Sequence, residues 1–223
     1  MKIGIIGGTG SHGGGLALRW ALTGENVVIG SRSLEKAKKT VEKYQKTVKV
    51  FGKHIKLEGR TNTDAVNDRD VVVLAVPYTS QIQILEEIRP FMNPETILID
   101  VSVPLEWRNG RPKPIEIPEG SCAERAANIL KNSNIRVIGA FKTIGAYSLR
   151  DLLADLDGDI FVCGEDEEAK EIVSQLVAKI KNLRALDAGP LSSSRASEMI
   201  VPVLIHLNKK YKSKHAYMKV LNI

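Results

Sequence analysis

Metal-binding and disulfide-forming residues are scarce in this sequence. It holds two cysteines, Cys122 and Cys163, and four widely separated histidines, and none of them lies at the spacing of a metal-ligand cluster. We therefore expect no metal site and two core cysteines. Ser-His-Asp order, a paired-carboxylate motif and an activated-cysteine context are also missing. No catalytic side chain is predicted, so any chemistry must rest on positioning bound groups.

Long apolar runs and aromatic residues are also lacking. No run approaches the length of a membrane span, and the N-terminus reads as a strand and not as a leader, which favours a cytoplasmic protein without membrane contact. Aromatic residues make up 5% and do not interleave with the lysines, so a nucleic-acid partner is disfavoured. The net charge of +6 suits a polyanionic small molecule, although lysines on a solvated face would give the same excess.

Strand-like and helix-like segments alternate along the chain, which predicts an α/β fold with a doubly wound, mostly parallel Rossmann-type sheet and a small, largely helical C-terminal appendage. Pro77 ends one strand, and the four prolines of residues 104–120 predict a long irregular loop. Strands are expected at 2–7, 26–30, 54–59, 70–77, 96–104, 136–141, 159–164 and 184–189. Helices are expected at 15–24, from the Ser33 cap to Gly52, at 64–68 and 80–92, from Ser121, and at 166–180 and 192–211, the last with a kink at Pro202.

Six glycines lie within Gly7 to Gly15, between the first strand and the first helix. This is where a dinucleotide pyrophosphate rests on helix N–H groups, and bare backbone lets the phosphates approach closely. The spacing Gly8-x-Gly10-x-x-Gly13 fits that motif, and its place in the first strand-helix unit makes it specific. Glycines inside the helix cost about 1 kcal/mol each relative to alanine, so we expect this helix to pack tightly on its neighbours.

The end of the second strand distinguishes the two nicotinamide cofactors. An NAD site offers an acid to the ribose hydroxyls there, whereas this chain has Ser31 and Arg32, with Lys36 one helical turn later. Both cations can reach a 2′-phosphate, which predicts NADP; the alternative is that they only begin a basic helix. Val76, Pro77 and Val103 follow the fourth and fifth strands, where ligands of parallel sheets bind.

These motifs resemble the reduced coenzyme F420:NADP oxidoreductases of archaea. The likeness runs through "IGGTGSHGGGLALR", "GSRSLEKA", "AVPY", "VPL", "FVCGEDEEAK" and "LDAGPLSSSR" to the final helix. It implies reversible hydride transfer between C5 of an 8-hydroxy-5-deazaflavin, coenzyme F420, and C4 of the nicotinamide of NADP. It also implies which residues contact NADP: Thr9, Ser11, His12, Ser31, Arg32, Lys36, Val76, Val103 and Ala146.

The same likeness places the deazaflavin over the nicotinamide near "FKTIGA", with Lys142, Ile144 and Gly145 as its contacts. The family pattern departs here, because it can carry His and Pro where this chain has Lys142 and Gly145. Lys142 could stabilise the anionic ring or a phosphate of the deazaflavin side chain, or it could be a plain solvated lysine. For His12, we expect the backbone N–H and not the imidazole to contact the nucleotide.

The predicted organisation is an NADP-binding Rossmann domain at 1–140 and a smaller portion at 141–223. That portion would hold the deazaflavin pocket and a homodimer contact, and its segment 159–188 could complete the Rossmann sheet. Residues 196–207 are apolar on nearly all sides, which suggests the dimer contact. Two alternative functions stay open: an NADP-dependent dehydrogenase of a small imine or hydroxy acid, and an NADP-sensing protein without turnover.

Overall fold

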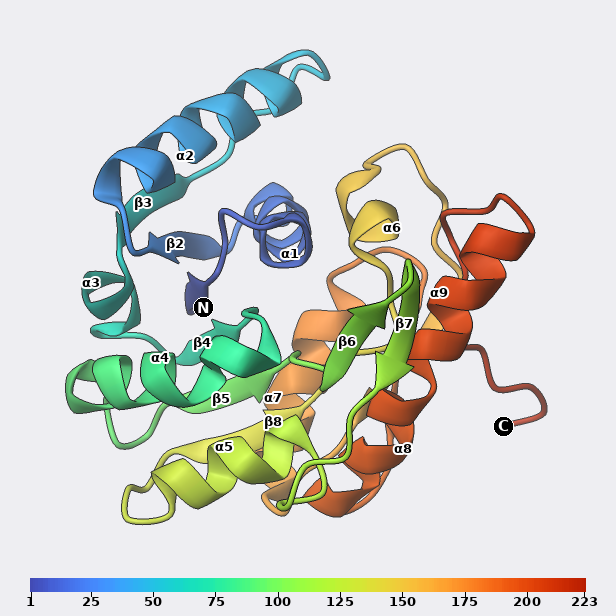
Figure 1. The fold of residues 1–223 in the computed structure, drawn as a ribbon. Coiled ribbons are helices and arrows are strands. Elements are labelled where there is room, and N and C mark those ends of the chain that lie inside the picture. Colours follow the sequence, from blue (N-terminus) through green and yellow to red (C-terminus); the bar gives the residue numbers. More distant parts are fainter.

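Six parallel strands form the centre of the computed structural model, which describes residues 1–223 (Figure 1). Their order across the sheet is β3-β2-β1-β4-β5-β8, which confirms the predicted Rossmann-type sheet. The switch point lies between β1 and β4, so ligands are expected at the carboxyl ends of these two strands. The strands are β1 (Lys2–Ile6), β2 (Asn26–Ser31), β3 (Leu57–Thr61), β4 (Val71–Leu74), β5 (Ile97–Asp100) and β8 (Arg136–Gly139).

Helices cover both faces of this sheet (Figure 1). One face packs on α1 (Ser11–Leu22), α2 (Leu34–Lys49) and α7 (Glu167–Ala178). The other packs on α3 (Asn62–Val66), α4 (Gln81–Ile88) and α5 (Cys122–Leu130). Successive strand residues alternate between the two apolar clusters, as Ile5 and Ile6 do. Every central strand is therefore buried on both faces, as parallel sheets require.

Most element boundaries shift by a few residues from the prediction, and two shifts affect the site. Helix α1 begins at Ser11 and not at residue 15, because the glycine run continues into the helix. Strand β3 begins at Leu57 and ends at Thr61, where the Thr61 side chain caps α3. The predicted Ser33 cap is confirmed, since its side chain accepts a hydrogen bond from the Lys36 N–H. Both cysteines are free and buried, as predicted.

The irregular loop predicted for residues 104–120 is wrong in its first half. Strands β6 (Leu105–Arg108) and β7 (Arg111–Pro114) pair there as an antiparallel hairpin. Asn109 and Gly110 join the strands with φ of 51° and 69°. Two left-handed residues give the tight turn that matches strand twist, and Asn-Gly is its preferred sequence. Pro112 and Pro114 lie in β7 of this two-stranded ribbon, where a missing N–H costs little.

The C-terminal portion packs against the sheet edge at β8. Strand β9 (Gly158–Val162) pairs with β10 (Leu183–Asp187), and Gly139 and Cys163 link this pair to β8 by an antiparallel bridge. The elements α6 (Ala146–Arg150), α8 (Ser194–Met199) and α9 (Val201–Lys210) complete the portion, and α8 gives way to α9 just before Pro202, as predicted. Short 3-10 turns occur at Tyr78–Ser80, Arg89–Phe91 and Leu191–Ser193.

One apolar cluster contains residues from both sides of residue 140, including Ile29 and Leu176. The division into domains at that residue stays a prediction. The last residues return along β9, where the Asp159 N–H donates to the Met218 carbonyl at 2.8 Å. None of the helices has the length and apolar character needed to cross a bilayer.

Candidate functional site

The glycine loop between β1 and α1 leaves the first turn of the helix accessible. Gly7 has φ of 81°, and a Cβ there would lie 2.1 Å from the Ala75 carbonyl oxygen of the loop after β4. The N-cap residue Gly10 provides no side-chain cap for α1. The helix therefore presents uncapped N–H groups and its positive dipole end, which together suit a pyrophosphate.

The remaining glycines of the motif permit close packing. A Cβ on Gly8 would lie 2.6 Å from the Ile29 Cβ of β2, and one on Gly13 would lie 2.9 Å from the Gly7 carbonyl oxygen. Inside the helix, Gly14 faces the Tyr44 hydroxyl and Gly15 faces the Leu149 Cβ, both closer than a Cβ would allow. The expected tight packing of this helix is confirmed, and it offsets the low helix propensity of glycine.

A cavity of about 210 Å³, here called the nucleotide cavity, opens beside the glycine loop. Arg32 and Lys36 at its rim are exposed, and Glu35, the acid in the first turn of α2, pairs with Lys39 at 2.6 Å. No carboxylate lines the cavity, so no negative charge there would repel a phosphate. The predicted residues that line it are Thr9, Gly10, Ser31, Arg32, Lys36, Val76 and Pro77.

A second cavity of about 380 Å³, here called the inner cavity, lies beyond the carboxyl ends of β4, β5 and β8. Its walls are largely apolar, as a site that excludes water requires. The structure thus brings together residues predicted for NADP and residues predicted for the deazaflavin. The predicted residues that line it are Gly10, Ser11, His12, Val76, Val103, Lys142, Ile144, Gly145 and Ala146. Gly10 and Val76 also line the nucleotide cavity, so the two cavities adjoin.

One wall of the inner cavity is formed by residues that the sequence did not indicate as site residues. Helix α9 contributes Val201, Leu204, Ile205 and Asn208, and the chain after it contributes Ala216. The spacing of these four helix residues marks one helical face. This spacing is visible in the sequence. Because residues 196–207 are apolar on nearly all sides, however, the sequence does not show which face of the helix lines the cavity.

Lys142 is buried at the floor of the inner cavity, with 1% of its side chain exposed. The alternative of a solvated lysine is therefore wrong. Its ammonium donates to Asp100 Oδ1 at 2.7 Å and to the Ser102 carbonyl at 2.8 Å, and it pairs with Glu198 Oε1 at 2.9 Å. These three oxygens match the three N–H bonds of an ammonium. A direct hydrogen bond from Lys142 to a ligand would require one of them to leave.

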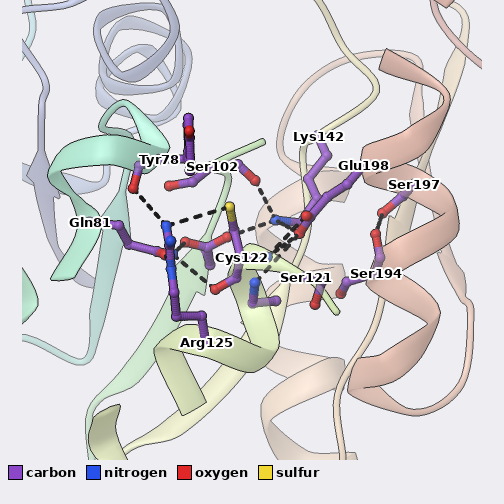
Figure 2. Close-up of polar contacts among 12 residues, drawn as sticks. Tyr78, Gln81, Ser102, Ser121, Cys122, Arg125, Lys142, Ser194, Ser197 and Glu198 are labelled. Carbon is purple, nitrogen blue, oxygen red and sulfur yellow. Dashed lines mark hydrogen bonds and ion pairs between the residues drawn. The ribbon is translucent and has the colours of Figure 1, made fainter. Parts of the chain in front are cut away.

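Buried hydrogen bonds extend this cluster to neighbouring helices (Figure 2). Asp100 accepts from Gln81 Nε2 at 2.6 Å, and Gln81 Oε1 accepts from Arg125 Nε at 2.6 Å. Glu198 accepts from the Cys122 N–H at 3.0 Å. Two cations and two carboxylates balance in charge, and with Gln81 they join α4, α5 and α8 to β5 and to the loop after β8.

The charges in this cluster alter the pKa values of its members. Burial alone would lower the pKa of Lys142, but Asp100 and Glu198 outweigh it and raise that pKa above its usual range. Burial raises the pKa of Glu198, and Lys142 opposes the shift. Lys142 is therefore charged at neutral pH. Burial, followed by the two carboxylates, raises the pKa of the Cys122 thiol, so that thiol is unreactive.

Two polar atoms at the inner cavity have no hydrogen-bond partner. They are His12 Nε2 and Ser102 Oγ, both buried and both on residues that line the cavity. Burial, then repulsion from Lys142, lowers the pKa of His12 to about 4, against a smaller opposite effect of the Phe141 carbonyl. The imidazole is therefore neutral near pH 7. A buried polar atom without a partner is unusual, and here it offers a hydrogen-bonding position to a ligand.

Groups of three or more histidine, cysteine or acidic side chains that could hold a metal ion do not occur in the structure. The predicted NADP and deazaflavin residues thus meet in two adjoining cavities, one cationic and one apolar. This arrangement can hold a phosphorylated dinucleotide along the sheet edge and a flat ring system beside its far end.

Comparisons with known proteins cover the whole chain for full-length relatives and its first half for a family model. Residues 2–104 match the model of a family described as NADP oxidoreductase, coenzyme F420-dependent. An F420-dependent NADP reductase of Methanothermobacter thermautotrophicus is 40% identical over 225 residues, which cover 100% of this chain and 96% of that protein. A second of the same name, from Methanocaldococcus jannaschii, is 40% identical over 226 residues, with 100% and 99% covered.

A solved structure from Arthrobacter sp. FB24 superposes on the whole chain with a TM-score of 0.82. It is 24% identical in sequence, and the match covers 100% of both chains. At that identity the likeness concerns the fold, and it includes the C-terminal portion as well as the Rossmann sheet.

Proposed function

This chain belongs to the family of coenzyme F420-dependent NADP oxidoreductases, and from that membership we propose that it is an oxidoreductase that transfers hydride reversibly between C5 of the deazaflavin and C4 of the nicotinamide. The observation that carries the proposal is the junction of a cationic cavity without acids and an apolar cavity. The glycine loop lines both at their shared edge, through Gly10.

NADP fits these residues. Arg32 and Lys36 would bind the 2′-phosphate, and the Ser31 hydroxyl is free to donate because it accepts only from the Ser33 N–H, at 3.2 Å. The uncapped start of α1 would bind the pyrophosphate. Val76, Val103 and Ala146 would then contact the nicotinamide end within the inner cavity. The His12 imidazole lines the same cavity, so we include its side chain as well as its backbone.

The deazaflavin would share the inner cavity with the nicotinamide, against Ile144 and Gly145. Bound together, the two cofactors supply a hydride donor carbon and a hydride acceptor carbon. The chain's own part is to hold the rings face to face and to exclude water, and the apolar wall from α9 serves that purpose. Lys142 acts here as a positioning residue, because its ammonium holds the Ser102 carbonyl at the cavity floor.

We further propose a homodimer. The outer face of α9 presents Val203 and Leu207, which are 47% and 37% exposed, and Met199 and Tyr211 extend this stripe at four-residue spacing. Side chains of this size in a continuous stripe mark a contact surface.

A single absorbance assay tests the proposed function. With NADPH and purified protein both present, the visible absorbance of oxidised coenzyme F420 should fade without added metal or flavin. Deuterium on the transferred face of NADPH should appear at the deazaflavin C5. The same assay with NADH, and with pyrroline-5-carboxylate in place of F420, supplies the controls. An unchanged absorbance with intact F420, or fading only after flavin is added, would contradict the proposal.

A further inference from the structure

Asn62 lies beside the residues expected to bind the 2′-phosphate, although no sequence motif pointed to it. Strands β2 and β3 pair in parallel with Ser31 opposite Thr61. The next residue on each strand, Arg32 and Asn62, therefore leaves the sheet at the same edge, and both line the nucleotide cavity. Asn62 begins α3, and the side chain of Thr61 caps that helix.

The Asn62 amide is buried and incompletely bonded. The residue is 3% exposed, and its Oδ1 has no hydrogen-bond partner. Gly30, its neighbour on β2, leaves room for this oxygen, because a Cβ there would lie 3.2 Å from it. A buried carbonyl oxygen without a donor is costly, so its retention beside a ligand cavity points to a donor on the ligand.

The chemistry of the nucleotide identifies that donor. A carbonyl oxygen can only accept a hydrogen bond, and a 2′-phosphate dianion offers none. The adenosine ribose of NADP keeps a single hydroxyl, at the 3′ position. Resting on the proposed function, we propose that Asn62 accepts a hydrogen bond from this 3′-hydroxyl, and that its neutral amide, where a carboxylate would favour NAD, does not repel the 2′-phosphate.

An uncharged amide is the form that suits NADP. A carboxylate in its place would accept from both ribose hydroxyls of NAD and would repel a 2′-phosphate held by Arg32 and Lys36. Asn62 thus complements the two cations. The cations attract the 2′-phosphate, and the amide accepts a hydrogen bond from the 3′-hydroxyl without repelling that phosphate.

The first test uses calorimetric titration of adenosine 2′,5′-bisphosphate and of its 3′-deoxy analogue, neither of which needs the deazaflavin. Asn62→Ala should weaken binding of the bisphosphate about 10-fold and leave binding of the 3′-deoxy analogue unchanged. Asn67→Ala is the matched control, since Asn67 is exposed and outside the cavity. Equal losses for both ligands, or no loss for either, overturn the proposal.

The second test exchanges the charge. Asn62→Asp should weaken NADP⁺ binding by about 10-fold or more and tighten NAD⁺ binding, whereas Asn67→Asp should change neither. An unchanged preference for NADP⁺ over NAD⁺ in Asn62→Asp overturns the proposal. Circular dichroism checks that each variant is folded. If Asn62→Ala unfolds, Asn62→Ser takes its place, because the serine hydroxyl can also accept a hydrogen bond. Asn62→Ser should then bind the bisphosphate with part of the affinity of the parent protein.

These titrations separate the inference from the function on which it rests. Arg32→Ala sets the scale, because loss of a charge-assisted contact should weaken bisphosphate binding about 10- to 100-fold and leave 5′-ADP binding unchanged. If the parent protein prefers the 2′,5′-bisphosphate to 5′-ADP and Asn62→Ala matches the parent, only the role of Asn62 falls. If the parent shows no such preference, the NADP assignment falls too.

Discussion

For His12, the proposed function assigns a role to the backbone N–H and to the side chain together. Its place in the first turn of α1 follows from the glycine motif, and the sequence indicates that role. The lowered pKa of its imidazole depends first on burial and then on Lys142, which comes from a distant part of the chain. That Arg32 and Ser31 line the nucleotide cavity could be predicted from their place at the end of a strand. The burial of Asn62 could not, because it arises only when β3 pairs with β2.

The folded state should lose stability in acid through His12. Its pKa is lowered from 6.5 to about 4, so the unfolded chain binds a proton more readily than the folded chain does. The contribution of neutral His12 is fully present above pH 6.5 and disappears as the pH falls towards 4. Between pH 7 and pH 4.5 it should amount to roughly 2 kcal/mol.

Denaturant titrations give the unfolding free energy of the parent protein and of His12→Gln at pH 7 and at pH 4.5. The contribution of His12 is the loss of unfolding free energy in the parent minus the loss in the variant. His54→Gln, at an exposed position, should behave as the parent does. A parent and a His12→Gln variant that lose equal stability would show that His12 titrates normally.

At the scale of elements, periodicity identified the central strands and the helices between them, because each buries a regular apolar face. The hairpin β6–β7 was missed because its prolines were given more weight than Asn109-Gly110, the strongest short hairpin signal. The setting of Lys142 could not be predicted, since Asp100 and Glu198 reach it from β5 and α8. No local sequence pattern predicts that these three side chains come into contact.

Lys142→Met should destabilise the protein by about 3–5 kcal/mol, because it leaves Asp100 and Glu198 buried without a counter-charge. Lys39→Met, which removes an exposed pair with Glu35, should cost less than about 1 kcal/mol. Denaturant unfolding measures both losses.

The double variant Lys142→Met/Glu198→Met should be less destabilised than the sum of its single variants, because it removes charges of both signs together. Strictly additive losses would mean that these two side chains do not interact.

At the scale of the whole molecule, the two faces of α9 point to different neighbours. The face with Leu204 and Asn208 closes the inner cavity, while the face with Val203 and Leu207 is uncovered. Light scattering at micromolar concentration should therefore give about twice the chain mass of 24.5 kDa.

Val203→Glu should shift this assembly towards the single chain, because a charge in the centre of an apolar contact is costly to bury. Leu153→Glu is the matched control, since Leu153 is 78% exposed and lies outside α9. A parent protein that scatters as one chain and is fully active would contradict the dimer.

Gly10, Ala75 and Val76 line both cavities, so the partition between them is one residue thick in places. A dinucleotide that extends across it becomes part of the surface that the second ligand meets. Linkage then acts in both directions: whatever factor the nucleotide adds to the affinity for the deazaflavin, the deazaflavin returns to the nucleotide. A dissociation constant measured for one of them alone describes a different binding surface from the one present during turnover.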